Sequence, residues 1–202
     1  MQDVDNFIID FETLATTPRA VVRCLSLIPF KLGKEESIDE LLSRQLTVWF
    51  DAEGQLEAGR EIDEDTLDFW NRQLNNAKTE AERASAEAML GRHSEDVHPK
   101  EALEIVAAYI QDVAPAGLMY ARGSNFDYPI FEDLCRQYGV TLPFSTWKVA
   151  CSKSILRFAC GNDKEVEAGL VAGLKSNHSS AFDCAVEAKK LQVLFTTFNA
   201  DG

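Results

Sequence analysis

Residues Asn6 to Leu14 read NFIIDFETL, and this stretch decides the fold. It begins as a run of strand-forming apolar residues and then places two carboxylates, Asp10 and Glu12, on either side of Phe11. Side chains alternate between the faces of a strand, so both carboxylates are expected on one face and Phe11 on the other. Two charges about 6 Å apart repel by about 3 kcal/mol at an effective dielectric constant of about 20. A divalent cation, a basic partner or exposure at the strand end would each relieve that repulsion.

Two further strands are predicted directly after the first. The segments Ala20–Pro29 and Gln45–Phe50 are rich in β-branched and aromatic residues, as strands are. From Ile62 onward the pattern becomes mostly helical, with short strands expected at Gly117–Ala121 and Trp147–Cys151. The predicted helices cover residues 63–74, 79–91, 99–113, 126–139 and 153–158, and a last helix begins at residue 179 or 180.

This order of elements predicts an α/β fold. Three strands in succession indicate an antiparallel N-terminal meander, and the later strands, each separated by a helix, indicate parallel pairing. The sheet is therefore mixed, with helices on both faces. The sequence has no repeat, low-complexity tract or Pro/Gly-rich linker, so a single domain over residues 1–202 is expected.

Composition limits the classes of function. The formal net charge of −13 argues against a broad basic surface for nucleic acid, but it is compatible with a small cleft where carboxylates hold cations that face a phosphate. No apolar run approaches the roughly 18 residues of a membrane span, and the acidic N-terminus is unlike a signal peptide. Five scattered cysteines without CxxC spacing favour buried thiols in a reducing cytoplasm.

A third carboxylate, Asp127, lies in the segment RGSNFDYP between a predicted strand and the following helix. The structural interpretation is that Ser124 or Asn125 caps this helix and that Asp127 sits favourably in its first turn. The functional interpretation is a site residue at the end of a sheet strand, where the sites of α/β folds gather.

The segment NHSSAFDCA contains His178 and Asp183. The spacing of Ser180 and Asp183 fits a capping box, and His178 could be an ordinary loop histidine. Alternatively, a loop histidine just before a helix that bears a carboxylate can take a proton from an attacking water at neutral pH.

The order of these motifs changes their weight. A D-x-E pair at the end of the first strand, a lone aspartate in the middle and H-x-x-x-x-D near the C-terminus together resemble the DEDDh exonucleases of the ribonuclease-H-like superfamily. The segments FIIDFETL, GSNFDYPIF and HSSAFDCA resemble more closely the motifs of phage-encoded exodeoxyribonuclease A and related small exonuclease domains of phages and bacteria. The helix around Trp70 is also similar to a segment of that group.

The resemblance implies a role for each matched residue. Asp10 would bridge two divalent ions, Glu12 and Asp183 would complete the site of one, and Asp127 would help to hold the other. His178 would be the general base. The oxygen ligands favour Mg²⁺ or Mn²⁺. The candidate contacts to the terminal nucleotide are Phe11, Thr13, Leu14 and Asn125.

The sequence therefore predicts a metal-dependent 3′–5′ exonuclease that releases nucleoside monophosphates from a nucleic acid with a free 3′ end. DNA is favoured by the phage-like relatives, and the first alternative is an exoribonuclease of the same fold. A second alternative is a non-catalytic module that binds nucleic acid or a partner protein. Four cations near or after the second motif are candidates for backbone contacts: Arg122, Lys148, Lys153 and Arg157.

Overall fold

The structure is a computed structural model, and it describes residues 4–114, 116–172, 174 and 179–200. A six-stranded mixed sheet forms its centre, with the strand order β4-β3-β2-β1-β5-β6. The strands are β1 (Asn6–Thr13), β2 (Val22–Phe30), β3 (Leu46–Phe50), β4 (Asp96–Val97), β5 (Met119–Ala121) and β6 (Val149–Cys151).

The sheet divides into an antiparallel and a parallel part. Strands β1, β2 and β3 pair antiparallel, as the predicted meander requires. Strand β5 pairs parallel with β1 and with β6, and the short β4 pairs parallel with β3. Strand β1 therefore lies at the centre, between the two parts.

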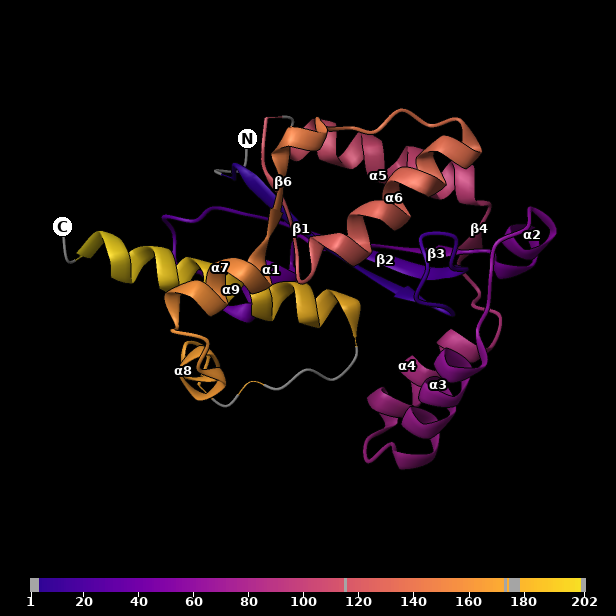
Figure 1. Cartoon of the computed structure of the whole chain (residues 1–202), viewed down its shortest axis with the longest axis horizontal. Helices are drawn as coiled ribbons and strands as arrows, with labels where there is room; N and C mark the ends of the chain where they lie inside the picture. The colour runs from indigo at the N-terminus through magenta and orange to yellow at the C-terminus, as the bar shows by residue number, and fades with distance from the viewer. Residues whose placement is uncertain (1–3, 115, 173, 175–178, 201–202) are drawn as a thin grey trace.

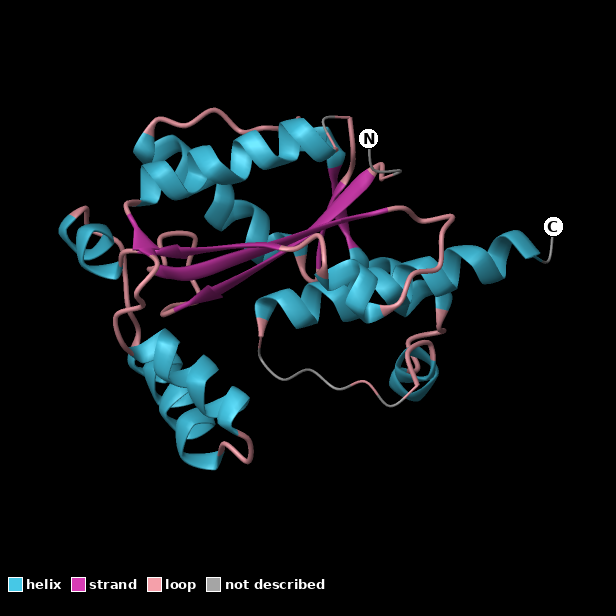
Figure 2. Ribbon diagram, turned by 180° about the vertical axis from the view of Figure 1, so that it is seen from behind, coloured by secondary structure: helices cyan, strands magenta, loops and turns pink. Residues whose placement is uncertain are grey.

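Helices cover both faces of the sheet (Figures 1 and 2). Helices α5 (Pro99–Val113) and α6 (Ser124–Tyr138) lie on one face. Helices α1 (Ile38–Leu42), α7 (Ser152–Ala159) and α9 (Ser180–Ala200) lie on the other. The pair α3 (Glu64–Asn76) and α4 (Glu80–Leu90) projects from one end of the sheet (Figure 1). The short helices α2 (Ala52–Glu57) and α8 (Lys164–Gly169) complete the described part of the chain.

Strand β1 has the predicted alternation of side chains. Phe7, Ile9 and Phe11 belong to the core beneath α5 and α6, and the ring of Phe11 meets that of Phe131 edge-on, with centroids 5.8 Å apart. Ile8 packs on the opposite face, in the core beneath α9. Asp10 and Glu12 therefore continue the α9 face towards the C-terminal end of the strand.

The long elements agree with the prediction, and several short ones do not. Thr79 and Glu82 form the expected capping box of α4. Helices α1, α2 and α8 and strand β4 were not predicted, because segments of two to six residues carry too little periodicity. Helix α6 begins two residues earlier than expected. The predicted strand at Trp147–Cys151 is a strand only from Val149, after a 3₁₀ turn at Thr146–Lys148.

All five cysteines are free thiols, and four of them are buried. Within the described residues, no helix is both long and apolar enough to cross a membrane.

Candidate active site

The first two carboxylates stand at the C-terminal end of β1. The pairing between β1 and β2 shifts register between Glu12 and Thr13, so a bulge ends the regular strand directly after Glu12. Bulges of this kind often re-aim side chains beside functional sites. The indole nitrogen of Trp70 on α3 donates a hydrogen bond of 3.0 Å to the carbonyl of Thr13. The helix pair α3–α4 thus fixes the end of the strand that carries Asp10 and Glu12.

Asp127 reaches the same place from α6. Strand β5 ends opposite Ile9, so the amide of Phe11 lies beyond the last β1–β5 pair. The carboxylate of Asp127 accepts a hydrogen bond of 3.2 Å from that amide. Asp127 is 3% exposed. Asp127 therefore attaches helix α6 to β1 at Phe11, the residue between Asp10 and Glu12.

The cap of α6 differs from both candidates suggested by the sequence. The N-cap residue is Gly123, which has φ 111° and ψ 63° and makes no side-chain cap. Ser124 and Asn125 are the first residues of the helix itself. The capping interpretation of Ser124 and Asn125 is therefore wrong, although Asp127 does lie in the first turn.

Asp183 lies in the first turn of α9, close to the sheet. The hydroxyl of Ser180 lies 2.6 Å from that of Ser26 on β2, which anchors the start of the helix. Small buried side chains, Cys184, Ala185 and Ala188, allow the helix backbone to approach the sheet closely. Ser180 is the first residue of α9, and its hydroxyl thus holds the helix against β2.

The electrostatics shows that these carboxylates are neighbours. Burial raises the pKa of Asp10 well above its ordinary value, and repulsion from Glu12, Asp127 and Asp183 adds to the increase. Burial, with repulsion from Asp183 and Asp127, raises the pKa of Glu12 to about 8. Burial also raises the pKa of Asp127 to about 7, against the effect of its hydrogen bond with Phe11. Among the described residues, no three acidic, histidine or cysteine side chains are arranged to hold a metal ion as they stand.

A charge network missed by the sequence analysis borders Asp10. Arg122 donates to Glu187 at 2.7 Å and to Glu167 at 2.9 Å, and Lys190 lies 3.0 Å from Glu167. Glu187 is 3% exposed and adds to the repulsion that raises the pKa of Asp10. Its signal in the sequence was its place one turn after Asp183, on the same face of the predicted last helix.

Cavities lie on both sides of Glu12. The larger one, about 710 Å³, is bordered by Phe11, Thr13 and Trp70, together with Phe69 and Phe126. The smaller one, about 350 Å³, extends from Glu12 over β2 and β3 towards α4. A third cavity, about 370 Å³, is bordered by Asp10, Asp183 and the Arg122 network. The volumes are in the range of small-molecule sites.

The predicted substrate contacts do not all line a cavity. Phe11 and Thr13 border the larger cavity beside Glu12, whereas Leu14 is 5% exposed and belongs to the buried cluster of Trp70 and Met89. Asn125 is exposed on α6. His178, the predicted base, lies outside the described residues.

The predicted backbone contacts are also dispersed. Arg122 is paired within the network beside Asp10. The ammonium group of Lys148 donates to the carbonyl of Ala116 at 2.8 Å, and Lys153 and Arg157 lie on α7. The four cations therefore do not form one row beside the carboxylates.

Comparison with known families identifies the chain. A model described as the 3′–5′ exoribonuclease Rv2179c-like domain matches residues 5–195. The chain belongs to this Rv2179c-like family. The chain is also similar to an exodeoxyribonuclease of Enterobacteria phage T4, with 31% identity over 136 residues. The aligned part covers 65% of this chain and 56% of the phage protein, so the chain spans little more than half of that protein.

Solved structures with the same fold are far more distant in sequence. The Escherichia coli ExoI–ssDNA complex in its zinc-bound form has a TM-score of 0.58 at 10% identity, over 99% of this chain and 41% of that one. The Schizosaccharomyces pombe protein Pop2p, in its Mg²⁺- and Mn²⁺-bound form, has the same TM-score and identity, over 95% and 82% of the two chains. The Rv2179c-like chain thus has the ribonuclease-H-like exonuclease fold that its motifs predicted.

Proposed function

We propose that this chain is a metal-dependent 3′–5′ exonuclease with its active centre at Asp10, Glu12, Asp127 and Asp183. The observation that supports this most strongly is the convergence of four carboxylates from β1, α6 and α9, close enough for their charges to raise the pKa of Asp10 and of Glu12. The Arg122 network pairs with Glu167 and Glu187. The charges of Asp127 and Asp183 add to the pKa increases of Asp10 and Glu12.

These residues fit divalent cations by their chemistry. Four carboxylates supply hard oxygen ligands and a formal charge of −4, which suits Mg²⁺ or Mn²⁺. Asp10, Glu12 and Asp183 are the proposed ligands of one ion, and Asp10 with Asp127 those of a second. Two such ions, when bound, orient and acidify a water and neutralise charge on the attacked phosphate. Pop2p, of the same fold, is described with Mg²⁺ and Mn²⁺ bound.

The protein's own groups have distinct parts in this proposal. The carboxylates lie on a strand and two helices, so their backbones hold the site without help from loops. The cavity beside Glu12 receives the terminal nucleotide, with Phe11 and Thr13 in its lining and the rings of Phe69 and Phe126 available to the base. His178 is proposed as the general base, on the strength of the sequence resemblance. Leu14 belongs to the buried cluster of Trp70, which borders this cavity.

For the polymer, two candidates have support. DNA is the first, as expected from the motifs, and the phage T4 relative is an exodeoxyribonuclease. RNA is the second, because the matched family is described as an exoribonuclease domain. A protein can distinguish the two through contacts to the 2′-hydroxyl.

The test is digestion of 5′-labelled single strands of matched DNA and RNA sequence with Mn²⁺ or Mg²⁺. A ladder that shortens from the 3′ end is expected for wild type, with no turnover by Asp10→Ala. Asp112→Ala, a change of an exposed aspartate on α5, should behave as wild type. If wild type and Asp10→Ala were equally inert while both bound the strand, the chain would be a binding module. The faster of the two ladders identifies the polymer.

A further inference from the structure

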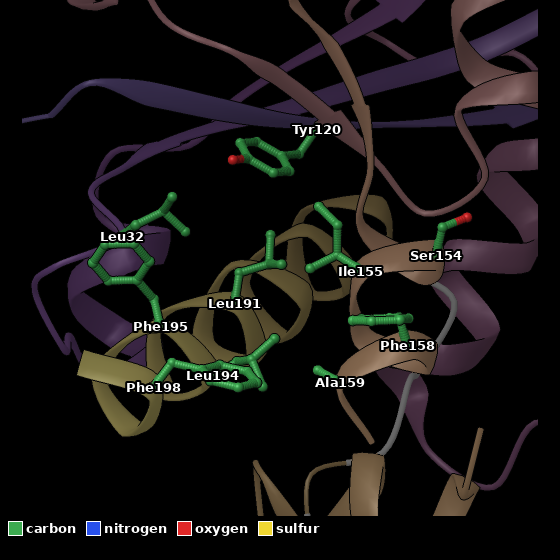
Figure 3. Close-up of a pocket in the computed structure, with 10 residues that line it drawn as sticks. All are labelled: Leu32, Tyr120, Ser154, Ile155, Phe158, Ala159, Leu191, Leu194, Phe195 and Phe198. Carbon is green, nitrogen blue, oxygen red and sulfur yellow. The ribbon is translucent and has the colours of Figure 1, made fainter. Parts of the chain in front are cut away.

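An apolar groove lies on the α9 face of the sheet, and the proposed active centre uses none of its lining (Figure 3). Its volume is about 550 Å³. Helix α7 and the C-terminal half of α9 form its walls, and Tyr120 of β5 and Leu32 close it (Figure 3). The lining residues are Leu32, Tyr120, Ser154, Ile155, Phe158, Ala159, Leu191, Leu194, Phe195 and Phe198.

The groove exposes aromatic side chains that folding alone would bury. Phe158 is 90% exposed and Phe198 is 63% exposed, and they stand on opposite walls. Phe195 also lines the groove and is 41% exposed. Contiguous apolar surface of this kind marks interaction sites on soluble proteins.

The two helical walls of the groove lack acidic residues, unlike the chain as a whole. Residues 143–162 and 188–200 contain no aspartate or glutamate, although the net charge of the chain is −13. They supply the 3₁₀ turn at Thr146–Lys148, β6, α7 and most of α9. Lys153 and Arg157, one turn apart on α7, follow the edge of the wall that presents Phe158. Within the described part of the chain, neither has an ion pair, whereas Lys189 and Lys190 are paired with glutamates.

We propose that this groove binds an acidic peptide segment of another protein, whose large apolar side chains enter between α7 and α9. Its carboxylates would lie along Lys153 and Arg157, where the local positive charge steers and orients them. Phe158 and Phe198 would be buried at the centre of the contact, as aromatic hot spots are.

Other occupants fit these observations less well. Nucleobases carry donors and acceptors on their edges, and a lining whose side chains offer only the hydroxyls of Tyr120 and Ser154 would leave most of them unsatisfied. A second copy of the chain, paired through a twofold axis, would bring the same cationic α7 edge near itself.

The test measures fluorescence anisotropy with a short fluorescein-labelled peptide that repeats Glu-Leu-Glu-Phe. Saturable binding is expected, weakening as salt rises, while a control peptide that repeats Lys-Leu-Lys-Phe should bind far less. Phe158→Ala should weaken binding by about tenfold or more without loss of stability, since the ring is exposed. The same variant should digest oligonucleotides as wild type does.

A charge reversal on α7 tests the electrostatic contribution to peptide binding. Arg157→Glu is expected to weaken binding of the acidic peptide by about fivefold or more. Arg72→Glu, the same change at an exposed residue on α3, should leave it unaltered. Equal affinity for both peptides would overturn the proposal. So would a dimer dispersed by Phe158→Glu, or displacement of the peptide by single-stranded DNA or RNA.

Discussion

At the scale of single residues, the charges of Asp10 and Glu12 destabilise the fold, and the same charges are what the proposed metal site requires. On the sequence alone, a basic partner could have neutralised them. The structure instead adds Asp127 and Asp183, so like charges gather where one strand ends. A site that is strained without its ligand is a common cost of function.

This strain has a pH dependence with a definite sign. The pKa of Asp127 is about 7 and that of Glu12 about 8 in the folded chain, both above their ordinary values near 4. The folded state therefore holds more protons than the unfolded state between about pH 4 and about pH 8. Without divalent ions, the free energy of unfolding should fall as pH rises through this window, and Mn²⁺ should restore more of it at about pH 8 than at about pH 5.

The variant Asp127→Asn measures how much Asp127 contributes to this pH dependence of the free energy of unfolding. Asparagine keeps an oxygen that can accept from the amide of Phe11 but has no charge. Metal-free Asp127→Asn should be about 1–3 kcal/mol more stable than wild type at about pH 8 and nearly equal at about pH 5. Urea denaturation in EDTA at both pH values measures this, with Asp112→Asn as the control. The same difference from wild type at both pH values would show that Asp127 does not titrate in this range.

At the scale of elements, the sequence predicts what is long and periodic. The meander, α3 to α6 and the last helix follow from alternation, capping residues and helical spacing. The joint between β5 and α6 does not follow, because the cap there is a backbone conformation of Gly123 and no side chain signals it. The network of Arg122 with Glu167 and Glu187 was also missed, since its members are distant in sequence and meet only in the fold.

A further prediction concerns Gly123, at the joint between β5 and α6. Gly123 has φ 111°, which residues with a Cβ rarely adopt, and the nearest atom to an added Cβ, the side-chain oxygen of Asn125, would lie at 3.6 Å. Gly123→Ala should therefore cost about 1–3 kcal/mol through backbone strain and not through a clash. It should also lower turnover, because α6 carries Asp127 from this point.

A matched glycine provides the control for that experiment. Gly169 ends α8 without a positive φ, and an added Cβ would meet nothing within 4 Å. Gly169→Ala should be neutral or stabilise by up to about 1 kcal/mol. Urea midpoints of the two variants make the comparison. A Gly123→Ala protein as stable as wild type would mean that the start of α6 relaxes without strain.

At the scale of the whole molecule, the chain combines an acidic surface with two proposed sites of different character. The carboxylate centre lies at the C-terminal end of β1, and the apolar groove lies between α7 and α9. Two cations beside the carboxylates in the described part of the chain, Arg122 and Lys190, are already paired with Glu167 and Glu187. Among the described residues, a nucleic acid bound at the carboxylates therefore meets few free cations.

This arrangement predicts a weak salt dependence of nucleic-acid binding. If side chains neutralise one or two phosphates, log affinity for a single strand should fall against log salt with a slope of about −0.7 to −1.4. Anisotropy of a labelled oligonucleotide, with Ca²⁺ in place of Mg²⁺, measures the slope. A slope of about −4 or steeper would reveal a basic track. Flattening of such a slope by Arg157→Glu would place the strand along α7 and assign that helix to the substrate instead of to an acidic partner.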